Sequence, residues 1–261
     1  MSRQMAMTLT PEHSTSGSRP LPWGVWATLG FSALIIFGNF VSVMIAAIGI
    51  VASGENPDLA TNPAQLASNG TLVALSTLLS SPIVLGLTFL FANLRKGLPV
   101  KEYLGLHEVD WRTTLGWSLV LLLFAGLADL ITFLLGRPLV PDFMFNVYQT
   151  ATSKTLLWIA LVVAAPVSEE IFFRGFLFYG LQKTRLGSKG AILLSSLIWA
   201  PLHMQYDTYN LAAIMCLGLL LGVARWKGNS VYIPIVMHAL MNFIAAMEVM
   251  VQIALIPNGT A

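Results

Sequence analysis

The chain has 261 residues, of which 56% are hydrophobic and only 10% are charged, and its formal net charge is +2. Its mean hydropathy of +0.75 is far above the balance of a soluble globular domain and predicts a polytopic membrane protein. The sequence has no basic stripe with interleaved aromatic residues, so nucleic acid is not expected as a partner. The single cysteine, Cys216, excludes an intrachain disulfide.

Charged positions divide the sequence into seven apolar runs, at 20–54, 59–94, 113–136, 155–182, 190–206, 208–224 and 228–247. A helix that crosses the hydrocarbon core needs about 20 such residues, with a lower limit of roughly 17. The runs therefore predict an all-α transmembrane bundle of seven spans. Pro82 lies near the middle of the second run, where it favours a kink in one helix over a re-entrant pair that would give eight spans.

Basic residues predict the orientation of these spans, because cytoplasmic loops hold the excess of lysine and arginine. Eleven of the 14 basic residues fall before the first span or in alternate loops, which places the amino terminus inside. We expect one integral membrane domain in three parts. These are a polar cytoplasmic tail at 1–21, the first three membrane spans at 22–136, and a membrane-helix region at 137–261 that carries the polar residues described next.

Three ionisable residues lie inside the fourth apolar run, namely Glu169, Glu170 and Arg174. Charges at membrane depth cost several kcal/mol each unless they are paired or hydrated, so they indicate a functional site. Glu170 and Arg174 are four residues apart on one helix face, which favours an ion pair with a supporting structural role. Glu169 points about 100° away and has no cation in register, so it is the free carboxylate.

Four polar residues from three spans lie at similar depths when they are counted from the nearest basic residue on the inner side. The separations are 14 residues for Glu169, 14 for His203, 11 for His238 and 15 for Asn242. At about 1.5 Å per residue these residues would lie roughly 16 to 23 Å from the inner edge. Unrelated packing residues would scatter more in depth, so the agreement predicts a single site.

The chemistry of these side chains matches amide hydrolysis. Glu169 is suited to take a proton from water and to return it to a leaving amine, and His203 could hold the same water. His238 and Asn242 are four residues apart, so both can donate to the oxyanion that forms when a carbonyl is attacked.

Two other interpretations of the same residues stay open. Glu169, His203 and His238 match a zinc ligand set that leaves one position for water. The chain lacks a His-Glu-x-x-His motif on one helix, and a zinc mechanism would give Asn242 no role. We therefore favour no cofactor and rank a zinc-dependent reaction second. A transporter or binding protein could instead use the buried charges as a proton or ligand path.

Three motifs give the chain a resemblance to a known family. Glu169-Glu170-Ile171-Phe172-Phe173-Arg174 looks like Glu-Glu-x-x-x-Arg, Trp199-Ala200-Pro201-Leu202-His203 is similar to Phe-x-x-x-His, and His238-Ala239-Leu240-Met241-Asn242 looks like His-x-x-x-Asn. The chain thus resembles the CPBP family of intramembrane proteases, which includes CAAX prenyl endopeptidases and bacterial proteins linked to bacteriocin processing or immunity. The resemblance covers roughly residues 155–245, and Trp199 in place of phenylalanine is its one departure.

The resemblance implies that Glu169 and His203 activate water and that His238 and Asn242 stabilise the oxyanion. It implies a membrane-associated peptide or protein substrate, prenylated substrates among the candidates, and a location in the bacterial inner membrane. The family name has carried the word metalloprotease, whereas the CAAX branch looks like a metal-independent glutamate enzyme. Several members are assigned to immunity or scaffolding, which keeps a non-catalytic immunity protein as an alternative.

Overall fold

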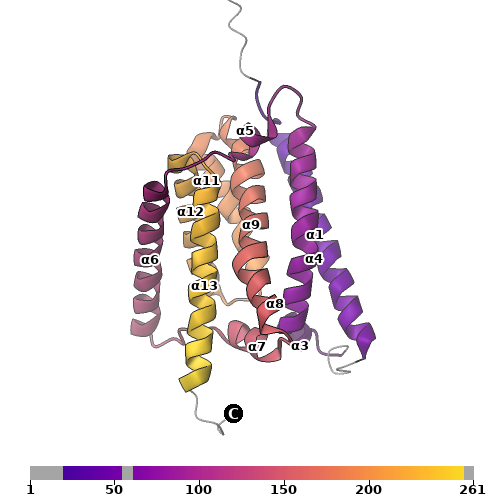
Figure 1. The fold of residues 1–261 in the computed structure, drawn as a ribbon, viewed down its shortest axis with the longest axis vertical. Coiled ribbons are helices and arrows are strands. Elements are labelled where there is room, and N and C mark those ends of the chain that lie inside the picture. Colours follow the sequence, from indigo (N-terminus) through magenta and orange to yellow (C-terminus); the bar gives the residue numbers. More distant parts are fainter. Residues whose placement is uncertain (1–19, 55–60, 256–261) are drawn as a thin grey trace, which may run out of the picture.

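The computed structural model describes residues 20–54 and 61–255. These residues form helices and connecting turns without a strand, which confirms the predicted all-α class (Figure 1). The predicted cytoplasmic tail at 1–21 lies outside the described residues except for its last two positions.

Six helical segments in the described residues are long and apolar enough to cross a membrane. They are α1 (Val25–Ser53), α4 (Gly70–Asn93), α6 (Trp111–Leu134), a composite helix (Lys154–Gln182), α12 (Thr208–Gly228) and α13 (Tyr232–Leu255). Shorter helices connect or flank them, namely α3 (Pro63–Ala67), α5 (Val100–Leu104), α7 (Asp142–Thr150) and α11 (Gly187–Trp199). Pro82 lies inside the continuous α4, so the second apolar run forms one helix and not a re-entrant pair.

The segment predicted as the fifth span is shorter than expected. Its helix α11 has 13 residues, and a 3-10 turn, η3 (Ala200–His203), with Pro201 in its first turn follows it. A helix of this length spans roughly 20 Å, whereas the hydrocarbon core is about 30 Å thick. The chain then reaches Asp207, whose carboxylate pairs with Arg137 just beyond α6. Seven spans are therefore not confirmed, and the cytoplasmic amino terminus stays a prediction.

The composite helix is interrupted twice by π-helical winding. It consists of α8 (Lys154–Trp158), the π-helix η1 (Ile159–Ala164), α9 (Ala165–Glu170), the π-helix η2 (Ile171–Leu177) and α10 (Phe178–Gln182). Pro166 gives a physical reason for the first change, because proline has no N–H and its ring crowds the carbonyl four residues earlier in an α-helix. The two π-helices flank the short α9, which carries both glutamates.

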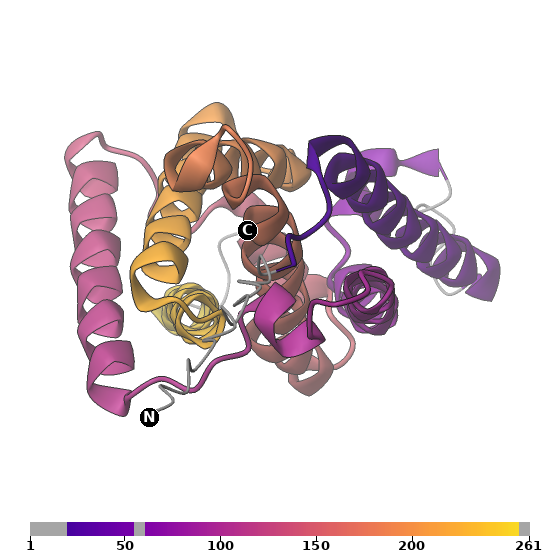
Figure 2. The ribbon, with the colours of Figure 1, turned by 90° about the horizontal axis from the view of Figure 1, so that it is seen from above.

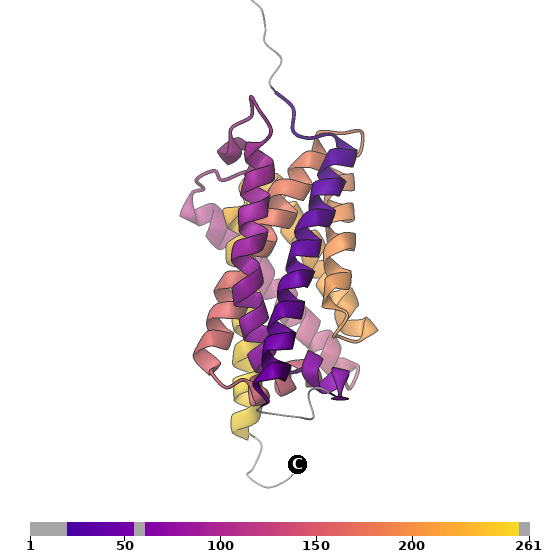
Figure 3. The same ribbon diagram turned by 90° about the vertical axis from the view of Figure 1, so that its right-hand side faces the viewer.

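The composite helix packs between two groups of helices. The pair α1 and α4 lies side by side on one flank (Figure 3), and α11, α12 and α13 lie on the other. Figure 2 shows α6 at the outer edge, where it packs on α13 and α12. The largest buried cluster surrounds η2 and α10, so the composite helix forms the centre of the fold.

Arg225 does not lie in an inner loop, which its position at the end of an apolar run had indicated. It lies in α12 and is 2% exposed. Its Nε donates to the backbone oxygen of Arg174 at 2.9 Å, and its guanidinium lies over the Phe178 ring. Gly105 leaves room for the Arg225 guanidinium, since a Cβ at this glycine would lie 2.2 Å from Arg225 Nη2. These contacts offset the cost of burying the charge.

Candidate active site

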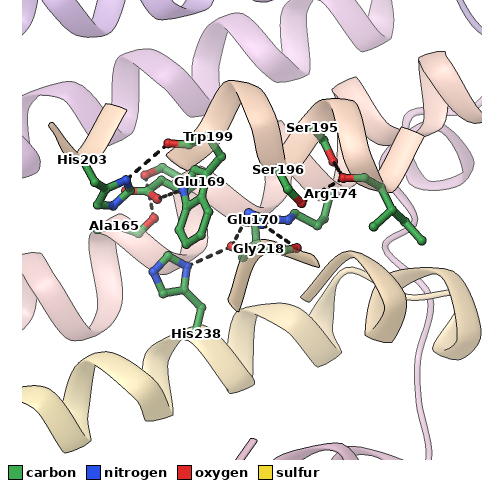
Figure 4. A network of polar contacts seen from close by, with 12 residues as sticks. Ala165, Glu169, Glu170, Arg174, Ser195, Ser196, Trp199, His203, Gly218 and His238 are labelled. Atoms are coloured by element: carbon green, nitrogen blue, oxygen red, sulfur yellow. Dashed lines mark hydrogen bonds and ion pairs between the residues drawn. The ribbon is translucent and has the colours of Figure 1, made fainter. Parts of the chain in front are cut away.

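The predicted ion pair between Glu170 and Arg174 is confirmed, and it is fully buried. Arg174 Nη1 donates to Glu170 Oε1 at 2.9 Å, and neither side chain is exposed. The second guanidinium nitrogen, Nη2, donates to the backbone oxygen of Gly218 on α12 at 3.2 Å. The pair thus ties the composite helix to α12 at the centre of the polar network in Figure 4. Burial of two opposite charges is tolerated here because each has a partner.

His238 on α13 uses the same carboxylate. Its Nδ1 lies 2.9 Å from Glu170 Oε1, and the residue is 3% exposed. An ionised carboxylate only accepts hydrogen bonds, so beside Arg174 it requires the proton on Nδ1. The other nitrogen, Nε2, is then an acceptor in the neutral ring. Nε2 of His238 can donate to an oxyanion only when each ring nitrogen carries a proton.

Asn242 is held by a backbone group that the π-helix releases. In η1 the Ala165 N–H bonds to the Ala160 oxygen, five residues back. The next bond in that register would run from Pro166 to the Leu161 oxygen, but proline has no N–H to give. Asn242 Nδ2 donates to the Leu161 oxygen instead, at 2.8 Å. One hydrogen of the Asn242 amide group is therefore committed to the backbone of η1.

Glu169 differs from Glu170 in its surroundings. It is half-buried and takes part in no ion pair within residues 20–54 and 61–255, which agrees with its predicted free carboxylate. Its Oε2 accepts a 2.6 Å hydrogen bond from the indole Nε1 of Trp199. The sequence motif identified Trp199 only as an aromatic residue in the place of phenylalanine, so this donor was missed.

His203 lies in η3, one turn after Trp199. Its Nδ1 is 3.3 Å from the Trp199 backbone oxygen, and the two rings meet edge to face with centroids 4.9 Å apart. His203 also interacts electrostatically with Glu169 and with His238. The structure therefore brings Glu169, His203 and His238 together around Trp199, while Asn242 lies one turn further along α13 and faces η1.

The zinc alternative can be tested against this arrangement. Within the described part of the chain, no three histidine, cysteine, aspartate or glutamate side chains lie close enough together to hold a metal ion. The set of Glu169, His203 and His238 therefore does not fit a zinc ion in this geometry. A reaction without a metal stays a prediction.

Comparison with known proteins supports the resemblance in the second half of the chain. Residues 151–244 match a family model described as type II CAAX prenyl endopeptidase Rce1-like, and this segment contains all three motifs. The chain is 28% identical over 114 residues to an uncharacterized 24.3 kDa protein of Escherichia coli, over 41% of this chain and 52% of that relative. It thus spans about half the length of the curated relative that it matches. No solved structure matches the chain.

Six helices able to cross a membrane and the family match together make the chain an integral membrane protein. The structure places residues of two of the motifs around one buried ion pair. Residues 151–244 of this chain are therefore similar to the type II CAAX prenyl endopeptidases described as Rce1-like.

Proposed function

We propose that the chain is an intramembrane endopeptidase that hydrolyses a peptide bond with water activated by Glu169 and His203. The observation that carries this proposal is the convergence of Glu169, His203 and His238, from three separate segments, on the buried Trp199. Glu170 is neutralised by Arg174, which leaves Glu169 as the carboxylate of the site that is not in an ion pair.

The reaction follows from the roles that each side chain can take. Glu169 accepts a proton from a water molecule held with His203, and the hydroxide oxygen attacks the peptide carbonyl carbon. The carbonyl oxygen becomes an oxyanion, to which doubly protonated His238 donates through Nε2 and Asn242 donates through its second amide hydrogen. The carbon–nitrogen bond then breaks, and Glu169 returns the proton to the leaving amine.

The substrate class that fits this site is a membrane-associated peptide or protein. Glu170, Arg174 and His238 lie deep among apolar helices, so a substrate must approach through the bilayer or along its edge. The family match names prenyl endopeptidases, which makes prenylated CAAX peptides the first candidates. A bacterial inner membrane is the location we propose.

The test compares membranes that contain the wild type, Glu169→Gln or a control variant, Glu102→Gln, at an exposed position of α5. Cleavage of a quenched prenylated CAAX peptide and of endogenous membrane peptides is followed by fluorescence and mass spectrometry. A positioned base contributes about 10²- to 10⁴-fold in rate, so Glu169→Gln should lose at least about 10²-fold in kcat. Glu102→Gln should retain wild-type activity.

Equal cleavage by the wild type and by folded Glu169→Gln would overturn the proposal. A vectorial transport signal that survives Glu169→Gln, without cleavage by the wild type, would favour the non-catalytic transporter or immunity protein. Cleavage that stops with a chelator and returns with added zinc would favour the zinc-dependent protease of the same family.

A further inference from the structure

Trp199 is the common neighbour of the motif residues. It is the last residue of α11 and is 1% exposed. Besides its hydrogen bond to Glu169, its ring lies 4.6 Å beneath the Arg174 guanidinium and meets the rings of His203 and His238 edge to face. Figure 4 shows the indole between these side chains. One aromatic residue therefore contacts all the ionisable residues of the motifs except Glu170.

The indole nitrogen of Trp199 can donate a hydrogen bond but cannot accept one. An indole N–H is a donor with no acceptor capacity, so the 2.6 Å contact makes Glu169 Oε2 the acceptor. Hydrogen bonds to ionised carboxylates are short and strong, and they favour the charged form of the acceptor. With Oε2 occupied by the indole, Oε1 of Glu169 is the oxygen left to take a proton from water.

The donor is also held in place. Gly218 on α12 leaves room for the indole, because a Cβ at that glycine would lie 3.0 Å from Trp199 Cε3. The face of the ring is covered by the Arg174 guanidinium, a cation–π contact that the buried site strengthens. A ring packed in this way cannot swing its N–H away from Glu169 without moving its neighbours.

We propose that Trp199 is a positioning residue, whose indole N–H orients the Glu169 carboxylate for water activation. This role rests on the proposed function. The phenylalanine of the motif that this segment resembles would retain the ring and lack the donor. The charged or titratable groups that interact with Glu169 from other elements are Arg174 on η2 and His203 on η3. His238 on α13 meets the Trp199 ring and bonds to Glu170.

The decisive variant is Trp199→Phe, which retains an aromatic ring and removes only the N–H donor. We expect kcat to fall about 10- to 100-fold, the range for loss of one hydrogen bond to a charged group, with KM changed less than about 2-fold. The control is Trp158→Phe on α8, whose ring packs on Phe243, and it should match the wild type in kcat and KM.

A second measurement does not depend on activity. The chain has seven tryptophans, so a ¹⁵N-labelled sample in detergent should give seven indole N–H cross-peaks. The peak missing in Trp199→Phe belongs to Trp199. Glu169→Gln, which neutralises the acceptor, should move that peak upfield by more than any other of the seven. This readout also decides the role if Trp199→Phe fails to fold, because Glu169→Gln retains the indole and the peak can be assigned in Trp199→His.

The outcomes separate the two proposals. Wild-type kcat in Trp199→Phe, alongside inactive Glu169→Gln, would overturn the positioning role and leave the proposed protease activity unaffected. A Trp199 indole peak whose chemical shift does not change in Glu169→Gln would also overturn the positioning role. Wild-type cleavage that does not depend on Glu169 would instead overturn the proposed function.

Discussion

Two groups of helices differ in the polar residues that they bury. The first group is α1, α4 and α6, and the second is the segment from α8 to α13. In the first group the buried polar residues are hydroxyls, namely Thr28, Ser32, Ser42, Ser76, Ser80, Ser81 and Thr88. In the second segment they include the charged or ionisable residues Glu170, Arg174, Arg225 and His238. Burial does not separate the two groups, because the apolar stretch of α4 is 39% buried and those of α12 and α13 are 33% buried.

The difference lies in where the hydrogen bonds go. A serine can bond within its own helix, as Ser42 does to the Gly38 oxygen at 2.8 Å, so it places little constraint on neighbouring helices. Arg174 has more donors than one helix can satisfy, and one of them reaches the Gly218 oxygen on α12. Buried charges therefore link the helices of the second segment to one another.

The largest expected effect comes from removing one partner of the buried pair. Arg174→Ala should lower the free energy of unfolding by about 3 to 5 kcal/mol, because it leaves the Glu170 carboxylate buried and uncompensated. Arg137→Ala is the matched control, since its pair with Asp207 is 38% and 49% exposed, and it should cost about 0 to 1 kcal/mol. Unfolding in detergent measures both. Similar losses would contradict the contrast between the two segments.

An intermediate effect is expected at Asn242. Asn242→Ala should destabilise the fold by about 1 to 3 kcal/mol, because the Leu161 oxygen loses its donor. Pro166→Ala restores a backbone N–H next to that oxygen, so Asn242→Ala should cost less in the Pro166→Ala background. The measurement is a double-mutant cycle on the free energy of unfolding.

The same double-mutant cycle distinguishes a structural role of Asn242 from a catalytic one. If Asn242 also donates to the oxyanion, Asn242→Ala should lower kcat in both backgrounds by about 10²-fold or more. Additive stability losses would show that Pro166 is not the reason for the Asn242 contact.

The smallest effect is expected at Ser81, where the two groups of helices touch. Its hydroxyl lies 3.1 Å from the Ser168 hydroxyl, which also donates to the Ala164 oxygen at 2.8 Å. Ser81→Ala should therefore cost less than about 1 kcal/mol and leave kcat unchanged, as scored by unfolding and by cleavage. A loss as large as that of Arg174→Ala would show that the first group also depends on polar contacts between helices.

Local spacing made much of this protein predictable. Glu170 and Arg174 are partners because residues four apart share a helix face, a relation that holds whatever the neighbouring helices do. Depth counted along each span was enough to place Glu169, His203 and His238 in one region. The family match agrees with the motifs that those residues define.

Contacts between helices were decided by the tertiary structure. The Trp199 bond to Glu169 and the Asn242 bond to Leu161 depend on helix rotation and on the π-helix register, neither of which hydrophobic patterning encodes. Helix length was misjudged at α11, because an apolar run was equated with a helix although Pro201 follows closely. The sequence by itself determined the helical membrane class and the buried ion pair, since these follow from composition and from spacing along one helix. Only the tertiary structure decided that Trp199 reaches Glu169, that His238 reaches Glu170 and that Asn242 reaches Leu161, because these three residues come from other helices.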